Sequence, residues 1–363
     1  MIRSVAIVGT GLIGASVALA ARRAGVEDVR GFDPDDAALA AAAERGAVDA
    51  AGSIAEAVGD VELAVVAAPV TVLPRSVAEV LAAAGDATVT DVGSTKGGVV
   101  RTAGADTRFI GGHPVCGSEA RGASNARAEL FEGATWFLTP VAATDANRYA
   151  ELHAFVSSLG AVPVAVDPES HDRIVAMTSH LPHALANLLV NQAGAGRVEG
   201  HEPLAAAGGS LRDMTRVAGA NPRIWIDIFL ENAEALRSAL GEHRRRIEQL
   251  EAALAQGDAG FLARWIAEAA ANRRRMLESA YADPGALQRV RVHVPDRPGV
   301  LAGITQALGA ERINIEDFEF QHLSPERGGV LTMLVASDEQ ARRAAELLEA
   351  QGYGVVVAPV VGE

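Results

Sequence analysis

Three clusters of polar residues in this chain have types and spacings suited to chemistry. In the first, His113 lies between Gly112 and Pro114, directly after a predicted strand. A histidine with a near-neutral pKa can accept a proton while a hydride leaves a neighbouring carbon. A structural loop histidine is the alternative. Cys116 is close in sequence, but hydride transfer needs no thiol nucleophile, so we expect it to be a small packing residue.

The second cluster, Asp91-Val-Gly-Ser94-Thr-Lys96, follows another predicted strand. It would lie at the edge of the sheet where α/β folds bind ligands. Ser94 could face such a ligand, or Ser94 or Thr95 could cap the next helix. Lys96 is the one lysine among 32 basic residues. Because lysine is a compact point charge and arginine a planar fork, its retention indicates a charge near substrate or cofactor, with chance retention as the alternative.

The third cluster occupies an apolar, helix-rich region that also contains His171-Asp172. His180 and His183, three residues apart, can share a helix face. No clear third ligand accompanies them, so we expect hydrogen bonds to an anionic substrate and no metal site. Arg216 could bind a carboxylate with both arms of its guanidinium, or pair with Asp213 three residues before it.

A dinucleotide site is predicted near the amino terminus. The GxGxxG motif at Gly9–Gly14 follows an apolar strand and opens a helix, whose amino end binds phosphate charge. Asp33 ends the second strand, where a carboxylate bonds a ribose hydroxyl and repels a 2′-phosphate, so NAD is favoured over NADP. A loop at Ala68 would pass under the cofactor. The expected cofactor-binding residues are Gly9, Gly11, Leu12, Ile13, Gly14, Asp33, Ala68 and Pro69.

The elements that must position these residues divide the chain into three predicted domains. Residues 1–167 alternate strands and helices, which predicts an α/β domain with a parallel, doubly wound, Rossmann-type sheet. Residues 168–284 read as an all-helical substrate and dimerisation domain. Residues 288–363 follow the β-α-β-β-α-β order of a ferredoxin-like domain. The expected strands of the first domain are 4–8, 29–33, 63–67, 87–91, 107–110, 134–138 and 162–166. The expected long helices of the second are 168–194, kinked at Pro182, 204–219, 222–255 and 258–280.

Composition narrows the class of protein. The formal net charge is −14, which argues against nucleic-acid or anionic-membrane partners. A single cysteine excludes an internal disulfide and multi-cysteine zinc sites. We expect a cytoplasmic protein, and the extensive apolar faces of the helical domain favour a homodimer.

These motifs, in this order, resemble the prephenate dehydrogenase family, which includes arogenate and cyclohexadienyl dehydrogenases. Cys116 departs from the small apolar residue expected at its position. The end of the chain resembles an ACT domain, a regulatory module that often binds an amino acid. The motifs are GxGLIG at Gly9–Gly14, DxGSxK at Asp91–Lys96, GGHPxxGSE at Gly111–Glu119, SHLPH at Ser179–His183, RDxTRxA at Arg212–Ala218 and NPxxWxDIFLxN at Asn221–Asn232.

The resemblance implies NAD-dependent oxidative decarboxylation of prephenate, or of arogenate, with tyrosine as an effector of the ACT domain. His113 would accept the proton of the substrate 4-hydroxyl, and Ser94 would orient His113 and contact that hydroxyl. Arg216 would bind a substrate carboxylate. The remaining substrate-pocket residues would be His183, His180, Lys96 and an ionic cluster of Glu119 and Asp213 with Arg216.

Two other functions remain as alternative hypotheses. A 3-hydroxyacid dehydrogenase would need a catalytic lysine on a helix of the second domain, and none is present there. A non-catalytic amino-acid sensor would keep the dinucleotide fold without turnover.

Overall fold

The computed structural model describes residues 2–116, 120–278, 286–324 and 328–360. The predicted site residue Glu119 lies outside these ranges. The chain divides into two compact units, Met1–Arg245 and Arg246–Glu363. The first unit contains the whole of the predicted dinucleotide-binding domain and most of the predicted helical domain. No helix of the described residues is long and apolar enough to cross a membrane.

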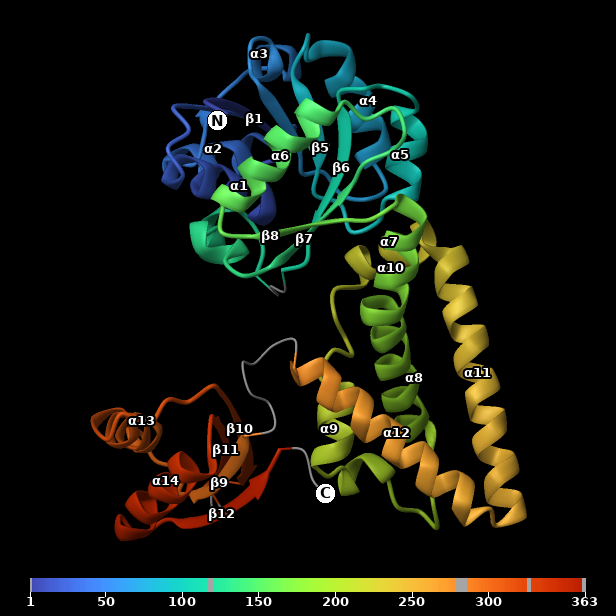
Figure 1. The fold of residues 1–363 in the computed structure, drawn as a ribbon, viewed down its shortest axis with the longest axis vertical. Helices are drawn as coiled ribbons and strands as arrows, with labels where there is room; N and C mark the ends of the chain where they lie inside the picture. The colour runs from blue at the N-terminus through green and yellow to red at the C-terminus, as the bar shows by residue number, and fades with distance from the viewer. Residues whose placement is uncertain (1, 117–119, 279–285, 325–327, 361–363) are drawn as a thin grey trace. The chain divides into compact units, whose positions relative to one another are not determined.

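An eight-stranded sheet with the order β3-β2-β1-β4-β5-β6-β7-β8 forms the centre of the first unit (Figure 1). The predicted strands are present, and the short β3 is an addition. The predicted direction of two strands is wrong, because β7 runs antiparallel to β6, and β8 runs parallel to β7. A parallel return needs a long crossover, usually a helix, whereas the described part of this connection holds only two 3₁₀ turns. The strands are β1 (Ser4–Val8), β2 (Asp28–Phe32), β3 (Asp49–Ala50), β4 (Leu63–Val66), β5 (Thr88–Asp91), β6 (Phe109–Pro114), β7 (Thr135–Thr139) and β8 (Val162–Ala165).

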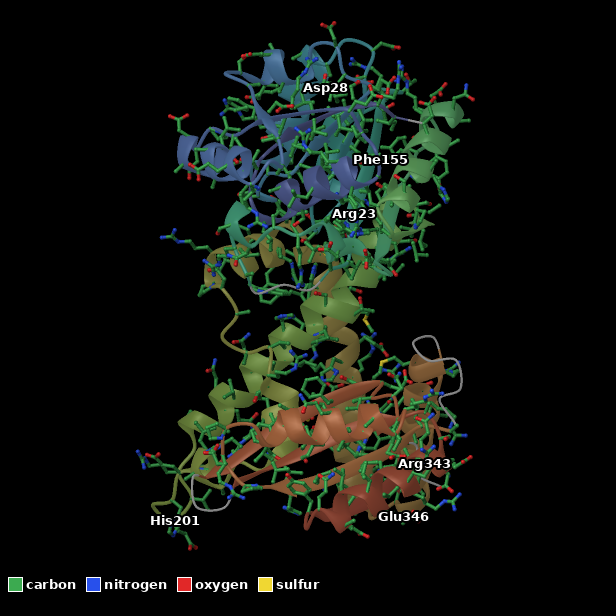
Figure 2. The ribbon with its side chains drawn as sticks, turned by 90° about the vertical axis from the view of Figure 1, so that its left-hand side faces the viewer. Arg23, Asp28, Phe155, His201, Arg343 and Glu346 are labelled. Carbon is green, nitrogen blue, oxygen red and sulfur yellow. The ribbon has the colours of Figure 1, made fainter. Side chains whose placement is uncertain are left out.

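Helices cover both faces of this sheet because its strands are apolar on both sides. In β1, Val5 and Ile7 pack in the core cluster that includes α1 and α6, whereas Ala6 and Val8 pack on the opposite face with α3 and α4 (Figure 1). Arg23, at the end of α1, pairs with Glu129 and Glu132 at 3.1 and 2.8 Å (Figure 2). These pairs tie the connection between β6 and β7 to α1. The helices are α1 (Leu12–Arg23), α2 (Asp36–Glu44), α3 (Ile54–Val58), α4 (Leu73–Ala83), α5 (Gly97–Ala103) and α6 (Ala146–Ser158).

The helical part differs from the prediction at three places. In place of the predicted helix 204–219, Pro203–Ala206 form a 3₁₀ turn and Gly209–Thr215 form a short helix. The predicted helix 168–194 contains a π-helical turn over Ala176–His180, directly before Pro182, whose missing N–H cannot bond the preceding turn. The predicted helix 222–255 is interrupted at Asn232, whose side chain bonds elsewhere. The elements are α7 (Pro168–Val175), η3 (Ala176–His180), α8 (Leu181–Ala195), η4 (Pro203–Ala206), α9 (Gly209–Thr215), α10 (Pro222–Glu231) and α11 (Ala233–Gln256).

The second unit holds the predicted ferredoxin-like domain and also α12 (Ala259–Glu278), a helix that the prediction assigned to the helical domain. Its four strands pair antiparallel in the order β10-β11-β9-β12. Alternate residues of β9 point into a core shared with both helices, and Arg343 and Glu346 lie on α14 (Figure 2). The elements are β9 (Gln288–Val294), α13 (Val300–Ala310), β10 (Asp317–Ser324), β11 (Gly328–Val335), α14 (Asp338–Ala350) and β12 (Gly354–Pro359).

Candidate active site

His113 lies inside strand β6 and not in a loop after it, which corrects the predicted strand end at residue 110. Across the ladder it is paired with Phe137 of β7. A strand backbone holds a side chain more firmly than a loop does. The position of this histidine is therefore set by the sheet itself.

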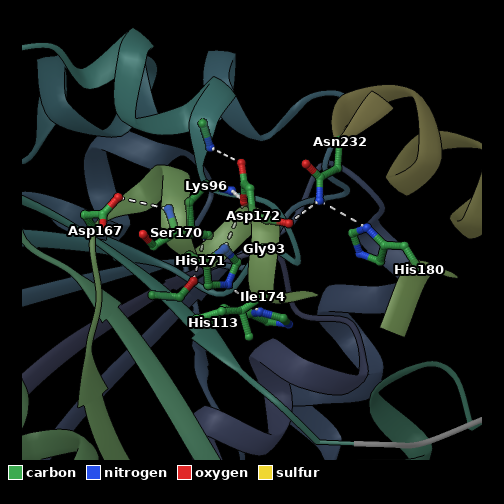
Figure 3. A network of polar contacts seen from close by, with 12 residues as sticks. Gly93, Lys96, His113, Asp167, Ser170, His171, Asp172, Ile174, His180 and Asn232 are labelled. Carbon is green, nitrogen blue, oxygen red and sulfur yellow. Dashed lines mark hydrogen bonds and ion pairs between the residues drawn. The ribbon is translucent and has the colours of Figure 1, made fainter. Parts of the chain in front are cut away.

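The ring of His113 is the first member of a hydrogen-bonded chain of three residues (Figure 3). Its Nδ1 lies 2.9 Å from Nε2 of His171, and Nδ1 of His171 lies 2.8 Å from the carboxylate of Asp172. Burial raises the pKa of Asp172, but hydrogen bonds from His171 and from the backbone N–H groups of Lys96 and Gly97 outweigh it and leave that pKa below its ordinary value. The carboxylate is therefore ionised and can only accept hydrogen bonds.

These two hydrogen bonds determine which nitrogen carries the proton in each of the two histidine rings. Because the carboxylate of Asp172 accepts, His171 must carry its proton on Nδ1, and the Nε2 of a neutral His171 is an acceptor. His113 then donates from Nδ1, which leaves its own Nε2 with a free lone pair. No other described group hydrogen-bonds that nitrogen. Burial is the main cause that holds the pKa of His113 well below 6.5, and nearby basic side chains lower it further, so at neutral pH the ring is an uncharged proton acceptor.

The structure corrects the expected role of Lys96. Its side chain is 0% exposed, so it does not present its charge to a substrate. The ammonium pairs with Asp91 and donates to the carbonyl oxygen of Gly112 at 2.7 Å. Desolvation lowers the pKa of Lys96, and the carboxylate of Asp91 opposes this shift.

Ser94 is partly exposed in the loop between β5 and α5, close in sequence to this pair. Among the described residues no hydrogen bond joins it to His113, whose ring is oriented by His171 instead. Neither Ser94 nor Thr95 caps α5. The side chain that accepts the N–H groups at the start of α5 is Asp172, at 2.8 Å from both Lys96 N and Gly97 N.

His180 and His183, which were predicted to share a helix face, both contact the indole ring of Trp225. His183 stacks on Trp225, with ring centroids 3.5 Å apart, and its Nδ1 donates to the carbonyl of Ser179. His180 contacts Trp225 edge-on and is 2% exposed, with Nδ1 facing the amide of Asn232. Burial lowers the pKa of His180 to about 4.

Arg216 is an exposed residue directly after α9. Burial of His183 is the main cause of its lowered pKa, and the positive charge of Arg216 lowers that pKa further. Among the described residues no ion pair joins it to Asp213, so the predicted ionic cluster is not formed by these two. Its guanidinium is available for an anionic partner.

The glycine motif has the geometry that a dinucleotide needs. Gly9 has φ +101°, and a side chain there would meet the carbonyl of Ala67 at 2.4 Å. A Cβ on Gly14 would lie 1.9 Å from the carbonyl of Gly9, whereas the space above Gly11 is open. Gly11 is the N-cap of α1, with no side-chain cap and no acidic residue in the first turn. The amino end of α1 can therefore approach a pyrophosphate.

Asp33 lies directly after β2 beside this motif. Its carboxylate accepts the backbone N–H of Thr10 at 2.7 Å and of Asp35 at 2.9 Å. Oδ2 also accepts the Thr10 hydroxyl at 3.3 Å, so Oδ1 is the oxygen that keeps a lone pair for a ribose hydroxyl. Ala68 and Pro69 follow β4 directly, in the predicted loop. The residues present thus fit a bound NAD.

Cys116 is half-buried against the core of the sheet domain, and burial raises the pKa of its thiol to about 11. A protonated thiol is a poor nucleophile. Within the described ranges, no group of three or more metal-ligating side chains converges on one point.

Comparisons with known proteins identify this arrangement. The family described as prephenate dehydrogenase, nucleotide-binding domain matches residues 17–165, and its dimerization domain matches residues 167–268. A prephenate dehydrogenase of Bacillus subtilis (strain 168) is 34% identical over 360 residues, which cover 96% of each chain. The chain belongs to the prephenate dehydrogenase family. An ACT domain matches residues 288–352.

Solved structures support this assignment. A prephenate dehydrogenase from A. aeolicus in complex with hydroxyphenyl propionate and NAD+ has a TM-score of 0.70 and 29% identity, covering 76% of this chain and 99% of its own. The arogenate dehydrogenase of Synechocystis has a TM-score of 0.68 and 28% identity, covering 75% and 99%. This member of the family is thus an NAD-dependent dehydrogenase with a Rossmann-type sheet, and its family resemblance is confirmed.

Several residues of the site escaped prediction. The pair His171-Asp172 stood out in the sequence, but nothing there connected it with His113, 58 residues earlier. Asp91 could have been predicted as a site residue, because it is a carboxylate at the end of a predicted strand and begins the DxGSxK motif. Asn232 and Trp225 lie within a recognised motif, yet their contacts depend on how α10 packs.

Proposed function

We propose that the protein is a cytoplasmic homodimeric prephenate dehydrogenase that converts prephenate into 4-hydroxyphenylpyruvate and CO₂ and is inhibited by tyrosine. The observation that carries this proposal is the free Nε2 of His113, held as an acceptor by His171 and Asp172. Oxidation of a ring alcohol needs such a base, placed on a rigid element.

The proposed reaction balances at the substrate. Bound NAD+ supplies the acceptor for the hydride that leaves C4. His113 takes the proton of the 4-hydroxyl at Nε2, so that a C4 carbonyl forms. The bond from C1 to the carboxylate then breaks, CO₂ leaves, and its electron pair makes the ring aromatic. The protonated His113 returns its proton to the phenolate oxygen, so the ring nitrogen is ready for the next turnover.

Other residues bind and orient the substrate in this proposal. Arg216, exposed and without an ion-pair partner among the described residues, would bind a carboxylate, and His183, stacked on Trp225, would contact the ligand. Ser94 would contact the 4-hydroxyl from the loop before α5. Because aromatisation drives the reaction, the protein has mainly to position its reactants.

Arogenate is the second candidate substrate, favoured by the similarity to the arogenate dehydrogenase structure. Prephenate and arogenate differ only in a keto group against an ammonium on the side chain. A relative that matches this chain along almost its whole length bears the name prephenate dehydrogenase, and this supports prephenate as the first candidate.

The homodimer is supported by exposed apolar side chains on α8 and α10, the region that matches the family's dimerization domain. Leu188 is 59% exposed, Ile226 55% and Leu230 71%. The ACT domain supports regulation by an amino acid, and tyrosine is the end product that such a pathway would sense.

The deciding experiment measures NADH formation by absorbance with prephenate and arogenate in parallel, each with and without tyrosine. Turnover of prephenate that tyrosine suppresses is the expected result. Turnover of arogenate alone would assign the second candidate. A folded protein that binds NADH but turns over neither substrate would refute both and favour a sensor.

A further inference from the structure

The buried pair of Asp91 and Lys96 holds both polar groups of the backbone at Gly112. The ammonium of Lys96 donates to the Gly112 carbonyl at 2.7 Å, and the carboxylate of Asp91 accepts the Gly112 N–H at 3.1 Å. Asp91 also accepts the N–H of Gly93 at 2.8 Å. Both side chains are 0% exposed. Gly112 directly precedes His113, so these bonds act on the backbone that carries the proton acceptor.

The Asp91–Lys96 pair lies where the hydrogen-bonded ladder between β5 and β6 ends. The ladder between β5 and β6 ends at Thr90 and Ile110, two residues before Gly112. Beyond that point β6 keeps its pairing with β7 on one edge only. The side chains of Asp91 and Lys96 replace ladder hydrogen bonds on the other edge, and so hold the last residues of β6 in line.

The same segment also holds the second histidine. The backbone N–H groups of Lys96 and Gly97 donate to Asp172, each at 2.8 Å, and Asp172 orients His171 (Figure 3). Residues 91–97 thus contact the backbone of His113 through Gly112 and the ring of His171 through Asp172. Residues 91–97 therefore connect strand β6, which carries His113, with helix α7, which carries His171.

We propose that the Asp91–Lys96 pair is a positioning device that sets the separation of the His113 and His171 rings. Neither side chain is placed to touch substrate, so both act through the backbone. The expected effect on kcat rests on the proposed dehydrogenase reaction. The expected effect on the separation of the two rings does not depend on that reaction.

The surroundings explain why this residue is a lysine. A Cβ on Gly111 would lie 3.3 Å from Cδ of Lys96, and one on Gly93 would lie 3.6 Å from Nζ. The two glycines thus leave the space beside a fully buried side chain free of Cβ atoms, and a compact ammonium occupies less of that space than the planar guanidinium of arginine would. The one lysine of the chain stands at this place.

The test compares Lys96→Arg, Lys96→Met and the double variant Asp91→Asn/Lys96→Met with the wild type. The double variant removes both buried charges together, which leaves no unpaired charge in the interior. Arg108→Met is the matched control, because Arg108 pairs with Asp106 in the same domain, near the start of β6, and bonds backbone carbonyls far from the two rings.

Five quantities are measured: kcat and KM with the active substrate, the dissociation constant of NADH by fluorescence, the melting temperature, and the NMR signal of the hydrogen-bonded ring N–H of His113, identified by its loss in His113→Asn. We expect the Lys96 variants to lower kcat by about tenfold to a hundredfold, the range for a displacement of ~1 Å at a reacting group. NADH binding should stay unchanged, and the ring N–H signal should weaken. The double variant should melt at a higher temperature than Lys96→Met without recovering kcat.

Wild-type kcat and an intact ring N–H signal in Lys96→Arg or in the double variant would overturn the proposal. A fall in kcat that Arg108→Met reproduces at equal loss of stability would also overturn it. If Lys96→Met does not fold, Lys96→Arg, which keeps the charge, decides the outcome. If the wild type turns over neither substrate, the proposed function fails, and the NMR signal still tests the positioning.

Discussion

Replacing Asp172 by asparagine tests the chain of residues behind His113. The carboxylate accepts three hydrogen bonds: from Lys96 N and Gly97 N at 2.8 Å each, and from His171 Nδ1 at 2.8 Å. An asparagine side chain has one accepting oxygen and one donating NH₂ group. At least one of the three donors must then face another donor.

The magnitude follows from this count. A hydrogen bond to a charged group contributes about 1.5–3 kcal/mol, and the two donors that remain bonded also lose the charge of their partner. We expect Asp172→Asn to lower the free energy of unfolding by about 2–4 kcal/mol. Lys96 N and His171 Nδ1 bond the same carboxylate oxygen, so the asparagine orientation that keeps both bonds places the NH₂ group against Gly97 N. His171 then bonds an uncharged acceptor and is held less firmly against His113, and kcat should fall by roughly tenfold.

The assay combines thermal unfolding with kcat from NADH absorbance, at a temperature where the variant is folded. Asp167→Ala is the control, since the Asp167 side chain caps the start of the same helix, α7, at Ser170 N, and among the described residues no hydrogen bond joins that side chain to either histidine ring. The control should lose stability and keep its kcat. An Asp172→Asn enzyme with unchanged kcat, or an equal loss in Asp167→Ala, would refute the reasoning.

The other predictions concern the acceptor, the carboxylate and the cofactor. His113→Asn should lose most of kcat and keep NAD+ affinity, and full activity would remove His113 from its role. Because burial holds the pKa of His113 well below 6.5, wild-type kcat/KM should be constant near neutral pH and fall only as acid protonates this ring; a fall beginning above neutrality contradicts this. Arg216→Ala should mainly raise the KM for substrate, and an unchanged KM excludes carboxylate binding. Asp33→Ser should reduce the preference for NAD+ over NADP+, measured as the ratio of the two activities, which stays constant if Asp33 does not bind the ribose.

Much of the fold could be predicted because its signals are local. Strand β1 has the predicted bounds, and the ferredoxin-like order of the last domain is confirmed. The direction of β7 and β8 and the break at Asn232 were predicted wrongly, because neither follows from propensity. The first depends on the connection after β6, whose described part holds 3₁₀ turns and no crossover helix, and the second on a side chain that bonds Asp172 and His180.

Some residues of the candidate site could also be predicted from local motifs, and others could not. The acceptor His113 and the helical histidines follow from motifs, whereas the partner His171 and the buried position of Lys96 do not. A sequence shows that a lysine is present and unusual. It does not show which way the side chain turns, because that depends on Asp91, Gly93 and Gly111 packing around it.

The sequence by itself determined the dinucleotide motif, the order of elements and the family. These depend on steric rules within a few residues: Gly9 must adopt a positive φ, and Gly14 must lack a side chain beside the Gly9 carbonyl. Only the tertiary structure decided that His113 is paired through His171 to Asp172 and held by a buried ion pair. Those contacts join residues distant in sequence, and their geometry exists only when sheet and helices pack together and exclude water from the charges between them.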